Sequence, residues 1–282
     1  LATNVLMYSR AAAGSVIPIG EFGGVLGATV TAGGCSGNCG AGTENAVTWR
    51  VGGLNTDATN AALFAGTTSL IKEGTGSWTL TGDNTYTGTT TVNGGSLIVN
   101  GDQSAGTNSV TVNANGTLAG AGVIGGNTVV NGRLAPGVNG LGTLTFGGDL
   151  TLNPGSTVVF EISKNPPAND RLIVGGTVRY AGALDLVNIS PDLLQAGDNF
   201  QLFSAPAYDG AFTTFNLPTL DLGLAWNTSR LAVDGRLWVV STNPPLFSTA
   251  AQSNGELVLS GQGGTPGWEY QVPPIIREKS ES

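Results

Sequence analysis

The chain has 282 residues, of which 45 are glycine and none is histidine, and its net charge at pH 7 is −8. Charged residues make up only 11% of the sequence, whereas about 25% is usual. The missing histidine excludes a histidine-based catalytic triad and histidine metal sites, and the acidic balance argues against nucleic acid as a partner. Hydrophobic residues make up 40% of the chain, which is enough to bury a core.

The two cysteines, Cys35 and Cys39, lie close together in a glycine-rich segment. We expect a local disulfide between them, which fits an oxidising, extracytoplasmic setting; two free thiols are the alternative. A structural metal site takes four ligands, and the sequence offers neither histidine nor further cysteine to complete one. We therefore expect no metal-binding residues.

A short pattern recurs along the middle of the chain, at intervals close to twenty positions. Asn93, Asn113, Asn131 and Asn153 each follow a short apolar run and precede a glycine or proline turn. A coil of about twenty residues cannot bury its own apolar face, but coils stacked about 4.8 Å apart can. The sequence therefore predicts an all-β fold, a parallel β-helix or solenoid, with glycines at its corners and a hydrogen-bonded ladder of asparagines.

The stacking also accounts for the few charges, because a charge repeated at one coil position would repel its own copy. We expect three parts along the chain: parallel β-helix repeats over 1–183, a β cap of aromatic-rich strands over 184–242, and a proline linker, partial β-sandwich-like strands and a tail over 243–282. Residues 190–197 offer the best helical segment, a single turn. No run of eighteen apolar residues occurs, so we expect no membrane insertion by this chain.

One segment, residues 70–97, closely resembles the autotransporter-associated β-strand repeat. Thirteen spaced positions match the repeat in order: Lys72, Gly74, Gly76, Trp78, Leu80, Gly82, Asn84, Tyr86, Gly88, Thr90, Val92, Gly95 and Leu97. The resemblance implies a right-handed parallel β-helix, of the kind found in autotransporter passenger domains, that is exported and then displayed on the bacterial cell surface or secreted. The family's repeat is a scaffold, so it brings no catalytic residues with it.

Carboxylates are the main candidates for chemistry, because β-helices also house polysaccharide lyases and hydrolases. Glu161, Asp170 and Asp185 lie in or beside predicted strands, with Arg171 and Arg179 nearby. Adjacent coils could bring two carboxylates within the roughly 5–9 Å that glycosidases use. Charges at coil edges that are solvated or paired are the alternative, and we favour it.

Five aromatic residues in strand-like contexts could stack on sugars, although packing in the core or cap is favoured: Trp49, Trp78, Tyr86, Trp226 and Trp238. Residues 120–125 match the dinucleotide pattern G-x-G-x-x-G, but a strand is predicted to follow where that motif needs a helix. Asp83 and Asn84 fit turn chemistry better than a calcium loop.

The leading hypothesis is therefore a non-enzymatic extracellular β-helical surface protein that serves adhesion, matrix or filament building, or display of another module. We assign no catalytic, cofactor-binding or metal-binding residue and no cofactor. The expected partners are glycans, other surface proteins or further copies associated end to end. The alternative is a carbohydrate-active enzyme, a hydrolase or lyase, or a glycan-binding module that uses surface carboxylates of the same scaffold.

Overall fold

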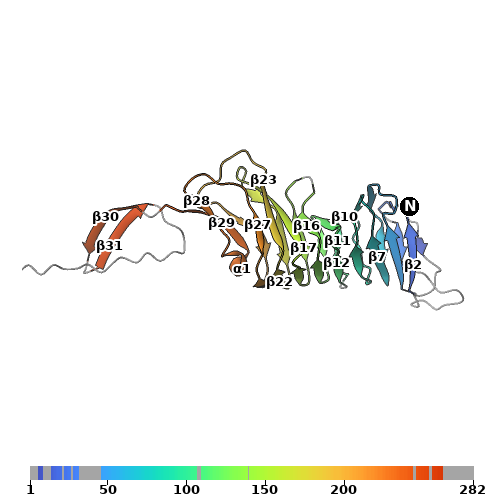
Figure 1. The fold of residues 1–282 in the computed structure, drawn as a ribbon. Coiled ribbons are helices and arrows are strands. Elements are labelled where there is room, and N and C mark those ends of the chain that lie inside the picture. The colour runs from blue at the N-terminus through green and yellow to red at the C-terminus, as the bar shows by residue number, and fades with distance from the viewer. Residues whose placement is uncertain are drawn as a thin grey trace, which may run out of the picture.

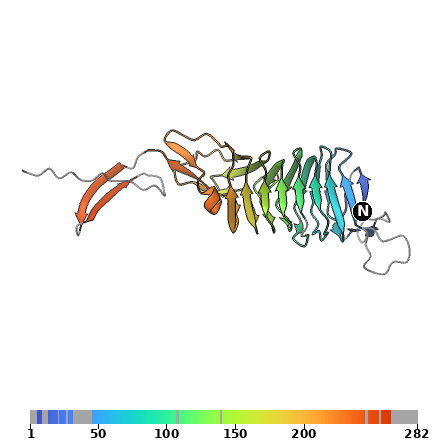
Figure 2. The ribbon, with the colours of Figure 1, turned by 60° about the horizontal axis from the view of Figure 1, so that its bottom comes forward.

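The computed structural model describes residues 6–8, 14–20, 22–26, 28–31, 46–106, 109–138, 140–243, 246–253 and 256–262. Its strands follow one another as a stack of coils, which forms an elongated body from β2 to α1 (Figure 1). Neighbouring coils pair their strands in parallel, as the row of arrows in Figure 2 shows. The predicted all-β parallel β-helix is confirmed.

Each complete coil contributes to three faces. Face 1 is a nine-stranded sheet in the order β2 (Ser15–Ile19), β4 (Val47–Val51), β7 (Thr68–Lys72), β9 (Thr90–Val92), β12 (Val110–Val112), β15 (Thr128–Val130), β18 (Leu150–Leu152), β22 (Thr177–Tyr180) and β26 (Ala207–Gly210). Face 2 runs β5 (Ala58–Asn60), β8 (Ser77–Leu80), β10 (Gly95–Val99), β13 (Gly116–Gly120), β16 (Arg133–Pro136), β19 (Thr157–Ser163), β23 (Ala183–Asn188) and β27 (Thr214–Asn216), with β20 (Ala168–Asn169) antiparallel to β19.

Face 3 consists of two shorter sheets. They are β1 (Leu6–Tyr8), β3 (Thr29–Thr31) and β6 (Leu63–Ala65), then β11 (Asp102–Gln103), β14 (Val123–Ile124), β17 (Thr143–Phe146), β21 (Arg171–Val174) and β25 (Phe203–Ser204). A small antiparallel sheet follows the coils, with β29 (Arg236–Ser241) between β24 (Asn199–Gln201) and β28 (Leu224–Asn227), beside the helix α1 (Leu231–Asp234). The last described element is a hairpin of β30 (Leu246–Ser253) and β31 (Glu256–Gln262).

The coil lengths agree with the spacing in the sequence. The positions of face 1 that pair in register from one coil to the next are Leu70, Thr90, Val110, Thr128, Leu150, Val178 and Tyr208. The intervals from Leu70 to Leu150 stay close to the predicted coil length, whereas the last two intervals are longer. The longer coils carry their extra residues between face 2 and face 3, after β16, β19 and β23. The other corners stay short, so the insertions project from one side of the solenoid.

Inward side chains form columns along the solenoid, because equivalent residues of successive coils are paired in register. In face 2 one column is apolar throughout, and its six members from β8 to β23 are each at most 1% exposed: Trp78, Leu97, Leu118, Leu134, Val158 and Leu184. Burying a side chain of this size contributes about 1.5–3 kcal/mol. The column therefore gives each coil an apolar face that only its neighbours can cover.

The corners explain the glycine content. A Cβ atom on Gly88 would lie 2.2 Å from the carbonyl oxygen of Thr68 in the preceding coil. Gly120 has a φ of +120°, and its Cβ would lie 2.0 Å from the carbonyl oxygen of Val99. Gly120 opens the G-x-G-x-x-G match at 120–125, which runs into strand β14 and then β15 with no helix, as predicted.

The predicted asparagine ladder forms as two bonded pairs. Nδ2 of Asn113 donates to Oδ1 of Asn93, and Nδ2 of Asn153 donates to Oδ1 of Asn131, each at 2.7 Å. Between the pairs, Nδ2 of Asn131 donates to the carbonyl oxygen of Val112 at 3.3 Å. The ladder thus ties successive coils together at the corner between face 1 and face 2.

Four sequence-based expectations can be compared with the structure: the start of the cap, the helical segment, the membrane span and the disulfide. Parallel pairing continues through β26 and β27, beyond the position 183/184 at which the sequence places the start of the cap; that boundary remains a prediction. Residues 190–197 contain turns and no helix, whereas the described helix α1 buries Leu231. Within the described ranges, no helix is both long and apolar enough to cross a membrane. Cys35 and Cys39 lie outside the described residues, so their disulfide remains a prediction.

Candidate functional site: a groove on face 2

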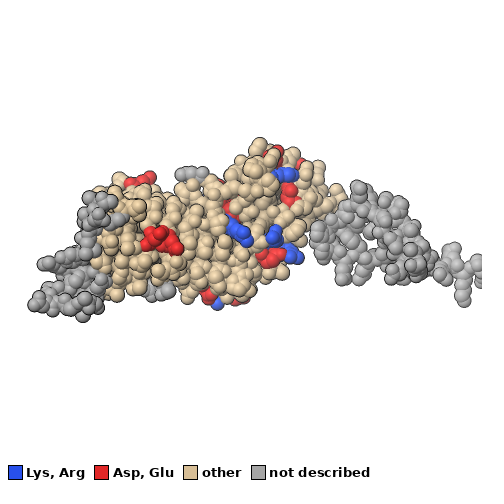
Figure 3. All heavy atoms as spheres, turned by 180° about the vertical axis from the view of Figure 1, so that it is seen from behind, with Lys and Arg blue, Asp and Glu red and all other residues tan. Residues whose placement is uncertain are grey.

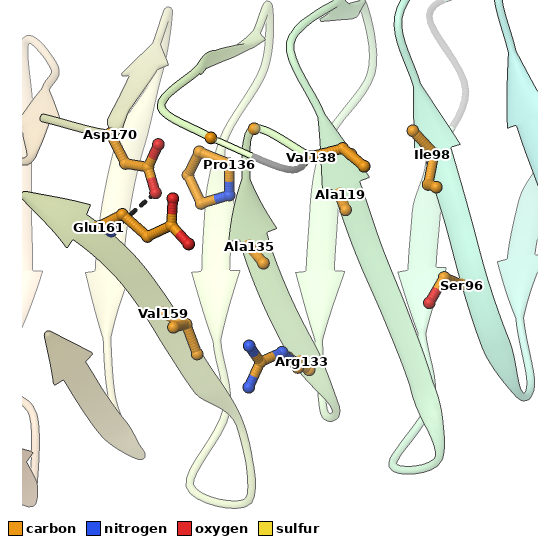
Figure 4. Close-up of a pocket in the computed structure, with 12 residues that line it drawn as sticks. Ser96, Ile98, Ala119, Arg133, Ala135, Pro136, Val138, Val159, Glu161 and Asp170 are labelled. Carbon is orange, nitrogen blue, oxygen red and sulfur yellow. Dashed lines mark hydrogen bonds between the residues drawn. The ribbon is translucent and has the colours of Figure 1, made fainter. Parts of the chain in front are cut away.

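A groove of about 230 Å³ lies on the outer side of face 2. Its floor is a row of apolar side chains from four successive coils, namely Ile98, Ala119, Ala135 and Val159 (Figure 4). The row exists because outward positions of stacked strands lie in register, and the two alanines leave it hollow. We call this feature the face-2 groove.

The two walls of the face-2 groove differ in charge. Ser96 and the exposed Arg133 lie on one side, and Glu161 and Asp170 lie on the other, beside Pro136 (Figure 4). The longer corner after β16 supplies the rest of the second wall. The groove therefore offers a cationic and an anionic wall above an apolar floor.

Asp170 is a buried carboxylate that holds backbone. Its Oδ1 accepts a hydrogen bond from the N–H of Gly142, and its Oδ2 accepts one from the N–H of Glu161, both at 2.7 Å. Burial raises the pKa of Asp170 to about 6, because loss of solvent and the nearby Glu161 charge outweigh the two N–H donors. These bonds fasten the corner after β16 to β19, so the carboxylate has a structural role.

Of the five charged residues predicted as candidates, only Glu161 and Asp170 come together. Asp185 lies on face 2 but accepts a hydrogen bond from Nδ2 of Asn216 at 2.6 Å. Arg171 lies on β21 of face 3.

Arg179 lies on face 1. Its Nη1 is 2.8 Å from Oδ2 of Asp149, and this hydrogen bond lowers the pKa of Asp149. Of the candidates outside the groove, Asp185 and Arg179 are therefore each bound to another side chain. In the view of Figure 3, acidic and basic side chains are few and scattered.

The aromatic candidates pack inside the molecule. Trp49, Trp78 and Tyr86 are at most 5% exposed, and Nε1 of Trp78 donates to the carbonyl oxygen of Phe22 at 2.9 Å. Trp226 is half-buried, and its Nε1 donates to the carbonyl oxygen of Pro218 at 2.9 Å. Trp238, on β29, is half-buried as well. No aromatic residue lines the face-2 groove as described.

The polar residues considered for calcium bind backbone instead. Oδ1 of Asp83 accepts from the N–H of Asp102 at 3.0 Å, and Oδ1 of Asn84 accepts from the N–H of Phe64 at 2.8 Å. In the part of the chain that the structure describes, no group of three or more cysteine or acidic side chains could hold a metal ion.

The sequence did not predict the groove or the place of Arg133 on one of its walls. The available signal was the pair of small residues, Ala119 and Ala135, at equivalent outward positions of adjacent coils. That equivalence depends on strand register, which the repeat spacing gives only to within a residue or two. A shift of one residue would have turned both alanines into the core.

The fold is a parallel β-helix, and its coils include a repeat similar to one found in autotransporter passenger domains. Residues 70–99 match the family described as Passenger-associated-transport-repeat, which confirms the resemblance of residues 70–97. The chain is 37% identical over 175 residues to "Adhesin BmaC autotransporter" of Brucella suis biovar 1 (strain 1330), a match that covers 58% of this chain and 5% of the adhesin.

A second relative is an "Extracellular serine protease" of Serratia marcescens. It is 36% identical over 103 residues, which cover 36% of this chain and 10% of that protein. The chain thus spans only a small part of either relative.

Proposed function

We propose that this chain is part of a non-enzymatic extracellular scaffold at the bacterial cell surface, with a role in adhesion. The observation that carries the proposal is the stack of passenger-type coils whose polar side chains mostly bind backbone or one another. The similarity to an adhesin autotransporter over 175 residues supports it. The same scaffold could display a neighbouring module or build a matrix.

The face-2 groove is the place where we propose that a surface partner, a protein or a glycan, makes contact. Its apolar floor and oppositely charged walls suit a partner that carries both positive and negative groups. The test uses beads coated with the protein and flowed over cell-surface preparations or over immobilised alginate and polygalacturonate. Ala135→Arg fills the groove, and Thr91→Arg on the outer side of face 1 is the matched control.

Retention of the beads should be lost with Ala135→Arg and kept with Thr91→Arg. Equal retention of both variants would remove the groove from the proposal, and no retention on any surface would contradict the adhesive role.

A carbohydrate-active enzyme remains the alternative, because Glu161 and Asp170 meet at the groove. The two backbone N–H groups bound to Asp170 and the absence of aromatic lining favour the scaffold. When the same polysaccharides are incubated with the protein, neither new reducing ends nor unsaturated products should form. Product formation that Glu161→Gln abolishes would establish the enzyme and contradict the scaffold.

A further inference from the structure

The coil stack ends on an uncovered strand. β27 is the last strand of face 2 and pairs in that sheet only with β23. All three of its residues, Thr214 to Asn216, are exposed, whereas β19 and β23 before it each bury several residues. The outer edge of β27 therefore presents backbone groups that can pair with another strand.

Phe215 is the last residue of the apolar column of face 2 at this end of the stack. It pairs in register with Leu184 and continues the inward apolar column of face 2. Leu184 is fully buried, but Phe215 is 38% exposed, because no further coil covers it. An apolar side chain at a core position is thus left facing solvent.

A cavity of about 260 Å³ lies beside this end of the column. Its lining includes Phe215, Phe212, Tyr180 and Leu231 of helix α1. The Phe212 and Phe215 rings meet edge to face, with centroids 5.9 Å apart. Helix α1 covers one side of the cavity and buries Leu231, but it leaves the corner at Phe215 open. The described cap is therefore incomplete over face 2.

The chain also carries a hairpin that pairs with no third strand among the described residues. β30 and β31 pair with each other, and the sheet they form has two strands among the described residues. A two-stranded hairpin is marginally stable in water by itself and gains stability from a third strand. The sequence of β31, Glu256-Leu257-Val258-Leu259-Ser260-Gly261-Gln262, is rich in apolar residues that favour strands.

We propose that a second copy of this chain covers the open end, and that its β30–β31 hairpin adds to the edge of β27. A bulky apolar residue of the added strand fills the cavity beside Phe215, while main-chain hydrogen bonds supply affinity. Each copy carries both the open edge of β27 and the β30–β31 hairpin, so two copies exchange hairpins reciprocally. The result is a closed two-fold dimer, which is the commonest symmetry among soluble oligomers. This association does not depend on the face-2 groove.

The first test is sedimentation velocity of the full chain over a range of concentrations. We expect a monomer–dimer equilibrium. Phe215→Asp should weaken the dimer at least tenfold, because it places a charge at the apolar contact. Leu222→Asp is the matched control, since Leu222 is fully exposed in the loop after β27 and should leave the dimer unchanged. Circular dichroism and the melting temperature verify that both variants fold.

A complementation experiment separates this arrangement from other modes of association. Phe215→Asp lacks the edge site but keeps the hairpin, and the double variant Leu257→Asp/Leu259→Asp lacks the donor strand but keeps the edge. Each alone should be monomeric, and an equal mixture should form a heterodimer through one exchange. A wild-type chain that stays monomeric at all concentrations, or a mixture that shows no heterodimer, would overturn the proposal.

Discussion

Single residues in this molecule show how a polar group is accommodated between stacked coils. Asp170 and Lys72 are both 1% exposed, and both bind backbone groups of a corner. Nζ of Lys72 donates to the carbonyl oxygens of Glu73, at 2.6 Å, and Gly94, at 3.3 Å. The buried ammonium group thus links the corner of its own coil to the corner of the next coil.

Asp170 should make the stability of the protein depend on pH. Its folded-state pKa of about 6 lies above the ordinary value of 3.8, so the native state keeps a proton that the unfolded chain has released. The stabilisation is present below the ordinary pKa and is lost as pH rises through about 6, a change of up to about 3 kcal/mol. Asp170→Asn should remove this dependence.

The measurement is urea unfolding of both proteins at several pH values. The free energy of unfolding of the wild type, minus that of Asp170→Asn, should fall as pH rises. This difference cancels the opposite trend from carboxylates whose pKa is lowered, such as Asp149. A difference that stays constant with pH would show that Asp170 ionises normally.

Replacing Lys72 by methionine should destabilise the fold by about 1–3 kcal/mol, because it removes the buried donor to the half-buried carbonyl oxygens of Glu73 and Gly94. Lys164→Met is the control. Lys164 is partly exposed, so its ion pair with Asp198, at 3.2 Å, and its solvent-exposed hydrogen bond to the carbonyl oxygen of Leu193, at 2.7 Å, should contribute only about 0–1 kcal/mol. Chemical denaturation measures both, and equal losses would contradict a special role for Lys72.

At the scale of the strand and its corner, the asparagine ladder converts a sequence period into bonds between coils. Asn113→Ala should cost about 1 kcal/mol, since it removes the donor to Oδ1 of Asn93. Asn113→Asp should cost more at neutral pH, because a carboxylate oxygen then faces the Asn93 oxygen. Below pH about 4 a protonated carboxyl can donate again, and part of the loss should return. A variant that is equally unstable at both pH values would contradict the ladder geometry.

The elements that could be predicted are those whose residues repeat. Asn93 and its equivalents indicated the coil length, and residues 70–97 indicated the fold, because stacking places like residues above like. Helix α1 could not be predicted from the sequence, since it is only four residues long and is stabilised by the packing of Leu231 against the last coil. The bonds of Asp170 also escaped prediction, because they join a long corner to β19 and no local pattern encodes them.

For the whole molecule, stacking implies that a coil is an interchangeable unit. Thr90 and Val110 occupy equivalent positions in adjacent coils. Deletion of residues 91–110 removes one whole coil and should therefore leave a folded, shorter solenoid with a smaller denaturant m value. Deletion of residues 91–100 breaks the register and should unfold the neighbouring coils. Far-UV circular dichroism and urea titration distinguish the two, and similar spectra for both deletions would contradict the stacking.

The lengthening of the coils toward β26 has a mechanical consequence. In the proposed role at the cell surface, flow past the cell would pull on the chain, and a stack held together by nearest-neighbour contacts would unfold one coil at a time. Each coil that peels off releases roughly 60–100 Å of extended chain, at about 3.3–3.6 Å per residue. Coils near β26 release the longest segments of chain. The length of each unfolding step therefore depends on the end from which the stack is pulled.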